Sequence, residues 1–122
     1  QLSSTPTPAA QIIAGSAETG TLTAGNTKVT FRAPEAMTLS KVKASLTTAS
    51  SSGLVTVDVN LAGTGSIFST PVTIDANEKT SETAATSAVL STTAIPDDAE
   101  LTIDVDTAGT GAVGLKVYLI PA

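Results

Sequence analysis

The chain has 122 residues, the usual size of one domain; 41% of them are hydrophobic and 14% are charged, so we expect a single globular core. It contains neither Cys nor His, which removes disulfides, thiolate metal sites and the usual general base. The net charge of −5 opposes binding to nucleic acid and to anionic membranes, and no apolar run approaches the roughly 18 residues of a membrane span. We therefore expect no nucleic-acid partner and no membrane partner.

The first ten residues (QLSSTPTPAA) are rich in Ser, Thr and Pro and offer little apolar surface to bury. Their prolines favour extended backbone. We predict an extended N-terminal arm over residues 1–10 that docks on a neighbouring subunit. A single β domain is expected over residues 11–122.

After the arm, residues 11–14 and 19–22 can each form a short edge strand. The pattern becomes clearer over residues 27–32, where Val29 and Phe31 alternate with polar residues, as in a strand with one buried face. Pro34 ends this strand, because proline has no N–H to donate to a neighbouring strand.

Two longer alternations follow, over residues 39–47 and 55–61. Aliphatic side chains occupy every second position from Val42 to Leu46, after Leu39, and from Val55 to Leu61, which is the period of a half-buried strand. Shorter apolar groups lie at residues 67–68 and 72–74, ahead of turn-forming residues. Residues 83–90 are rich in Ala and Thr and fit either a strand or a loop.

The last two alternations cover residues 100–106 and 115–120, and a turn with Pro96 at its second position precedes the first of them. Seven or eight short strands, with no segment of helical period, indicate an all-β fold. We predict an antiparallel β-sandwich of jelly-roll-like form with an extended N-terminal arm.

Two segments of the chain echo one another: VTVDVNLAGTG at residues 55–65 and LTIDVDTAGTG at residues 101–111. A duplicated unit would produce this, but the flanking segments do not align, so we favour two strands in equivalent environments. Each Gly-Thr-Gly sequence could be a phosphate-binding loop. No helix follows either one to bind an anion with its N-terminus, so we predict tight turns.

Six acidic residues are candidates for a metal or catalytic site, because calcium binds several carboxylate oxygens and glycosidases use two acids. No calcium-loop motif surrounds them, and outward-facing acids also protect sheet edges from unwanted pairing. We interpret them as a solvated face and expect no metal, no cofactor and no catalytic residue. They are Asp58, Asp97, Asp98, Glu100, Asp104 and Asp106.

Serine and threonine are abundant, but a serine nucleophile needs a base to take its proton. Without His, the remaining candidates for that base are lysines. They are Lys28, Lys41, Lys43, Lys79 and Lys116, and we expect none of them to lie in a Ser-x-x-Lys context. We predict that the protein is not an enzyme.

Carbohydrate binding is the main rival function on such a fold. Sugar rings stack on exposed aromatic side chains, and the chain has one Tyr, two Phe and no Trp. Phe31 and Phe68 are expected in the core. Tyr118 is expected to point outward beside Lys116 and Ile120, and we interpret it as part of a subunit interface.

Several segments resemble β-sandwich modules of tailed-bacteriophage virion proteins. The resemblance covers most of the chain after Lys28 and carries no catalytic residues. It rests on VTFRAPEAMTL at 29–39, VKASL at 42–46, IDANEKTS at 74–81, DDAELTIDVD at 97–106 and GLKV at 114–117. Such modules serve as capsid decoration (cement) proteins, head fibres or tail-fibre domains.

The resemblance implies a non-catalytic structural module on the surface of the virion, outside the cell. Our first hypothesis is a capsid decoration protein, with a fibre or tail domain next. The implied partners are other virion proteins, namely the major capsid protein or neighbouring subunits of a homo-oligomer such as a trimer. The alternative, from a different class, is a carbohydrate- or receptor-binding module.

Overall fold

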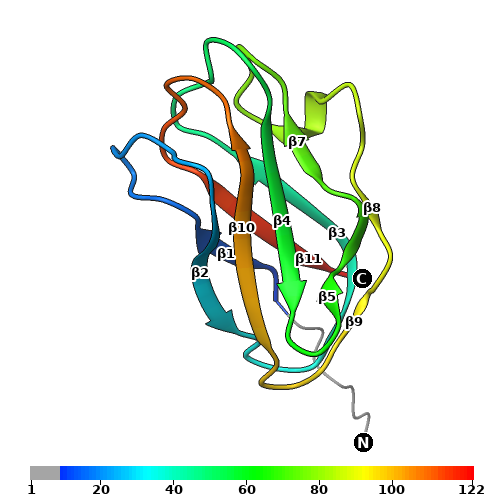
Figure 1. Cartoon of the computed structure of the whole chain (residues 1–122). Helices are drawn as coiled ribbons and strands as arrows, with labels where there is room; N and C mark the ends of the chain where they lie inside the picture. Colours follow the sequence, from blue (N-terminus) through cyan, green and yellow to red (C-terminus); the bar gives the residue numbers. More distant parts are fainter. Residues whose placement is uncertain (1–8) are drawn as a thin grey trace, which may run out of the picture.

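The computed structural model describes residues 9–122 (Figure 1). These residues form antiparallel β-sheets, so the prediction of an all-β, antiparallel fold is confirmed. The helix assigned among them is η1 (Ser81–Thr83), a single turn, and no helix in this part of the chain is long and apolar enough to cross a membrane.

Six strands have four residues or more, and five have two or three. The longer ones are β1 (Gln11–Ala14), β2 (Gly25–Arg32), β3 (Met37–Ser45), β4 (Val55–Leu61), β10 (Glu100–Ala108) and β11 (Lys116–Pro121). The short ones are β5 (Gly65–Ser66), β6 (Phe68–Thr70), β7 (Val72–Ile74), β8 (Val89–Leu90) and β9 (Ala94–Ile95). Residues 9–122 therefore form more strands than the seven or eight predicted, because turns divide residues 65–95 into short pieces.

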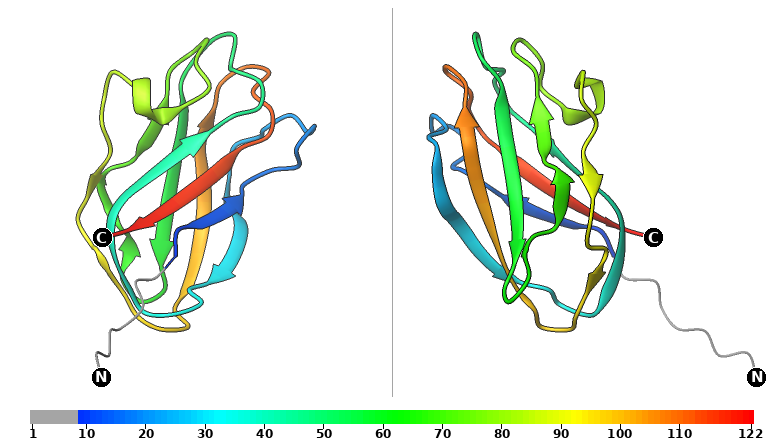
Figure 2. Two further views of the ribbon diagram at one scale, coloured as in Figure 1. Left: turned by 180° about the vertical axis from the view of Figure 1, so that it is seen from behind. Right: turned by 45° about the vertical axis from the view of Figure 1, so that its right-hand side comes forward.

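Two larger sheets account for most of these strands. One has the order β1-β11-β3-β9 and the other has the order β2-β10-β4-β5, with β7 also pairing to β4. In Figure 1 the strands β1, β11 and β3 cross behind β2, β10 and β4 at a clear angle, and the view from behind in Figure 2 brings them to the front. A separate ladder joins β6 to β8 at one side of the molecule.

Buried side chains from both larger sheets form one hydrophobic cluster. It follows from the alternation in the sequence: Val57 and Ile103 are fully buried, whereas Thr56 and Thr102 beside them are half-buried on the outer face. Burying one such aliphatic side chain contributes roughly 1.5–3 kcal/mol. Phe68 is buried and Phe31 packs partly buried against the same cluster, as predicted.

The two Gly-Thr-Gly sequences form turns at the ends of β4 and β10, as predicted. Gly63 and Gly65 have φ of 84° and 94°, and Gly109 and Gly111 have φ of 62° and 74°. Residues with a Cβ rarely adopt these angles, so glycine is required for the turns. The two similar segments, residues 55–65 and 101–111, contain β4 and β10, which are adjacent strands of one sheet. Their similarity therefore reflects equivalent positions in that sheet.

Two segments differ from the prediction or resolve it, and a third, the predicted arm, lies mostly outside the part of the chain that the structure describes. Residues 19–22 form no strand, and there Thr21 makes a single bridge to Val113. Residues 83–90 form the end of η1, a loop and β8, because their small side chains leave only Val89–Leu90 to pair. The predicted arm over residues 1–10 lies mostly outside the described residues; Ala9 and Ala10 are exposed and precede β1.

Candidate interaction surface

Tyr118 points outward from the middle of the four-stranded sheet. Val117 and Leu119 on either side of it are buried, while Tyr118 itself is half-buried, as are Lys116 and Ile120. This alternation confirms the predicted direction of all three side chains. Pairing with β1 and β3 then decides which residues surround the tyrosine.

The ring of Tyr118 has an apolar neighbour on one side and a polar pair on the other. Ile12 on β1 lies directly across from it and is 64% exposed. On β3, the amine of Lys43 lies 5.5 Å from the ring centroid, and the Ser45 hydroxyl is 3.0 Å from the tyrosine hydroxyl. We call this surface, made by Ile12, Lys43, Ser45, Lys116, Tyr118 and Ile120, the Tyr118 face.

Ion pairs border the Tyr118 face on two sides. The amine of Lys41 lies 2.6 Å from the carboxylate of Glu82 on η1, and Lys116 pairs with Glu18. The hydrogen bond from Lys41 lowers the pKa of Glu82, and the hydrogen bond from Lys116 lowers the pKa of Glu18. Both carboxylates are solvent-exposed, so salt screens these pairs and they orient side chains more than they stabilise the fold.

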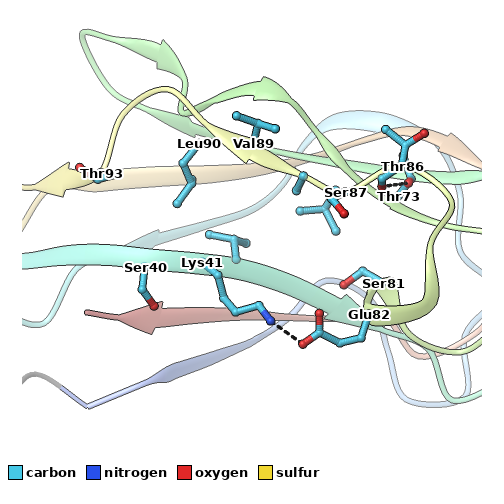
Figure 3. Close-up of a pocket in the computed structure, with 13 residues that line it drawn as sticks. Ser40, Lys41, Thr73, Ser81, Glu82, Thr86, Ser87, Val89, Leu90 and Thr93 are labelled. Atoms are coloured by element: carbon cyan, nitrogen blue, oxygen red, sulfur yellow. Dashed lines mark hydrogen bonds and ion pairs between the residues drawn. The ribbon is translucent and has the colours of Figure 1, made fainter.

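A groove adjoins the Tyr118 face where β3 faces the chain around β8 (Figure 3). Its volume is about 460 Å³, within the range of small ligand sites. Hydroxyl groups alternate with aliphatic side chains along it, and the Lys41–Glu82 pair lies at its rim. We call it the β3–β8 groove; it is lined by Ser40, Lys41, Val42, Val72, Thr73, Ser81, Glu82, Thr86, Ser87, Ala88, Val89, Leu90 and Thr93.

The predicted acidic residues fall into two groups. Asp58 and Asp104 lie directly opposite one another on the outer face of the five-stranded sheet. Hydrogen bonds reach both carboxylates: the Ser66 hydroxyl donates to Asp58 at 2.5 Å, and the Asn60 amide and the Thr27 N–H donate to Asp104 at 2.8 and 2.7 Å. These donors offset part of the repulsion between the two like charges.

Asp106 belongs to the same group. Partial burial raises the pKa of its carboxyl, and the charges of Asp58 and Asp104 raise it further. Across residues 9–122 no three acidic side chains gather closely enough to hold a metal ion.

Asp97, Asp98 and Glu100 lie apart from that group. Arg32 contacts two of them, with nitrogen–oxygen distances of 3.7 Å to Asp98 and 3.4 Å to Glu100. The side chains of Arg32, Asp98 and Glu100 are exposed. Their ion pairs therefore orient the turn before β10 and contribute little to stability.

Ser40 and Lys43 have the Ser-x-x-Lys spacing of some serine hydrolases, so the expectation that no lysine lies in such a context is wrong. The structure separates the two groups. The Ser40 hydroxyl donates to the carbonyl of Ile120 at 3.1 Å, while the Lys43 amine lies over the Tyr118 ring. Lys28 donates to the Thr23 hydroxyl at 2.7 Å, and in residues 9–122 no lysine amine is hydrogen-bonded to a serine hydroxyl.

No protein-family model, curated protein or solved structure matches this chain.

The β3–β8 groove is the feature that the sequence reasoning missed. Its outer wall comes from residues 86–93, and the sequence leaves residues 83–90 ambiguous between strand and loop. The signal available from the sequence was the density of Ser and Thr around Val89. Pattern alone could not place this wall opposite β3, because β3 lies some forty positions earlier in the chain.

Proposed function

We propose that this chain is a non-catalytic structural module of a bacteriophage virion, first of all a capsid decoration protein. In this proposal the two larger sheets form a jelly-roll-like β-sandwich. The module is a homo-oligomer that binds the major capsid protein or neighbouring subunits on the outer surface of the particle. The resemblance of residues 29–39 and 97–106 to phage β-sandwich modules supports the class of protein.

The Tyr118 face is the observation that supports binding to a protein partner. Tyr is enriched in protein interfaces because its ring buries apolar area while its hydroxyl keeps a polar contact. Ile12 exposes an aliphatic side chain beside the ring, and Ile120 extends the apolar strip. Lysines and carboxylates surround the strip, which is the arrangement of a polar rim around an apolar centre.

The direct test compares binding to undecorated particles by the wild type and by Tyr118→Ala. A central interface tyrosine contributes about 2 kcal/mol, so we expect roughly 30-fold weaker binding. Thr30→Ala serves as the control, since Thr30 is exposed on β2 in the other sheet. Failure of the wild type to bind particles would refute the proposal, and equal binding by both variants would reject the Tyr118 face.

The second candidate function is a carbohydrate- or receptor-binding module. One observation favours it: the β3–β8 groove carries the hydroxyls of Ser40, Thr73, Ser81, Thr86, Ser87 and Thr93. Its lining has no aromatic side chain on which a sugar could stack. Glycan-array binding that Ser87→Leu abolishes would favour this function over the structural one.

A further inference from the structure

One edge of β3 is open inside the β3–β8 groove. The Ala44 N–H donates to the Ser81 hydroxyl at 2.9 Å and the Leu46 N–H to the Lys79 carbonyl at 2.8 Å, both on the side away from β11. Backbone groups of an antiparallel strand point alternately to its two neighbours. The N–H and C=O of Val42 therefore point the same way as those of Ala44, into the groove.

Nothing in residues 9–122 pairs with Val42 on that side. The neighbouring strand β9 pairs only with Met37 and Thr38, and the next backbone bond along this edge joins the Leu39 N–H to the Thr93 carbonyl at 2.8 Å. Unpaired backbone groups on a sheet edge are a template for an added strand. A groove with such an edge fits an extended peptide, because the peptide supplies the missing N–H and C=O groups.

The walls of the groove indicate the side chains that such a peptide would carry. Val89, which is 50% exposed, and the half-buried Leu90 offer an aliphatic patch, and hydroxyls lie on both sides of it. Lys41 and Glu82 already neutralise one another at the rim. An uncharged peptide with one aliphatic residue among Ser and Thr residues would match this lining.

We propose that the groove binds residues 1–5 of a second copy of this chain as an added β-strand. Their sequence, Gln-Leu-Ser-Ser-Thr, is uncharged and has one aliphatic side chain, Leu2, for the patch. These five residues span about 13 Å from the first Cα to the last when extended. Pro6 has no N–H to donate, so it ends the pairing after Thr5.

The sheet order explains why the donor is a second copy. Leu119 on β11 pairs with Gln11 of β1 on one side and with Val42 of β3 on the other. The chain before Gln11 therefore leaves at one edge of the sheet, and the groove opens at the other. A residue before proline favours extended backbone, so the sequence at Pro6 and Pro8 disfavours a turn of the arm back across its own sheet. A contact between opposite edges is head-to-tail and closes into a ring when the rotation allows.

The inference rests on the proposed function in taking the protein to act in several copies. Its test needs purified protein alone, so it can succeed or fail separately from binding to particles. The chain has no Cys, which allows disulfide trapping without background. Ser87 is an exposed residue of the groove and a suitable trapping position.

The experiment mixes Leu2→Cys protein with Ser87→Cys protein under mild oxidation and measures mass on a non-reducing gel. We expect a covalent heterodimer in this mixture and at least tenfold less when Thr30→Cys replaces Ser87→Cys. In the double variant we expect crosslinked oligomers. No enrichment over the Thr30 control would overturn the proposal, as would a double variant that forms only an internal disulfide.

A second measurement avoids cysteines. Sedimentation of full-length protein over a dilution series should show self-association, and Leu2→Asp should weaken it at least tenfold by placing a charge against the aliphatic patch. Thr7→Asp is the matched control, with the same charge outside residues 1–5, and should associate like the wild type. Equal association of Leu2→Asp and Thr7→Asp, or a monomer at every concentration, would reject the added strand.

Discussion

Replacing Ile103 by Ala removes three carbons from the centre of the core. Ile103 is fully buried in β10, between Val29 on β2 and Val59 on β4. Truncating a buried Ile to Ala costs about 2–5 kcal/mol, from lost transfer energy plus the cavity left behind. For a domain of this size that corresponds to a fall in melting temperature of roughly 10–20 °C.

The neighbouring residue provides the control. Thr102 lies on the outer face of the same strand and is half-buried, so Thr102→Ala should change the unfolding free energy by about 1 kcal/mol or less. Urea unfolding followed by circular dichroism gives both free energies. The slope of the unfolding free energy against urea concentration should be the same for both variants if their unfolded states are the same. Equal losses for Thr102→Ala and Ile103→Ala would refute the assignment of the two faces.

Three further predictions concern the acidic group and the turns. The raised pKa of the Asp106 carboxyl means that folding favours its protonated form. Asp106→Asn should therefore raise the free energy of unfolding at pH 7, and this gain should disappear below about pH 3.8, where the carboxyl is protonated in the unfolded chain as well. Urea unfolding over a pH series measures both effects. A Cβ at Gly109 would meet the buried Ser50 hydroxyl whereas one at Gly63 would meet nothing, so Gly109→Ala should lower the melting temperature more than Gly63→Ala. Chelator should leave the melting temperature of the wild type unchanged, and a large drop would indicate a bound cation.

The long strands could be predicted from the sequence because the alternation within each one shows which of its residues are buried. Every second residue from Val55 to Leu61 is aliphatic, so the period identifies the strand and its buried face without knowledge of its partners. The same reasoning placed Tyr118 outside. Its neighbours Ile12 and Lys43 could not be predicted, because register across strands depends on pairing between residues far apart in the chain.

The groove was beyond sequence reasoning for a related physical reason. Its defining feature is a missing neighbour on one edge of β3, and an alternating pattern looks the same in an edge strand and in a central one. Its outer wall, residues 86–93, is held by contacts such as the hydrogen bond from the Thr73 hydroxyl to the Thr86 carbonyl rather than by a long ladder. Short polar segments of this kind carry little periodicity.

We propose that this chain is a structural component of a virion that binds through the Tyr118 face. A cryo-electron microscopy map of the intact purified particle tests it most directly. We expect repeated copies of the domain on the outer surface, with Tyr118 and Ile12 covered by a neighbouring protein. A map in which no density fits the domain, or in which every copy leaves Tyr118 facing solvent, would contradict the account.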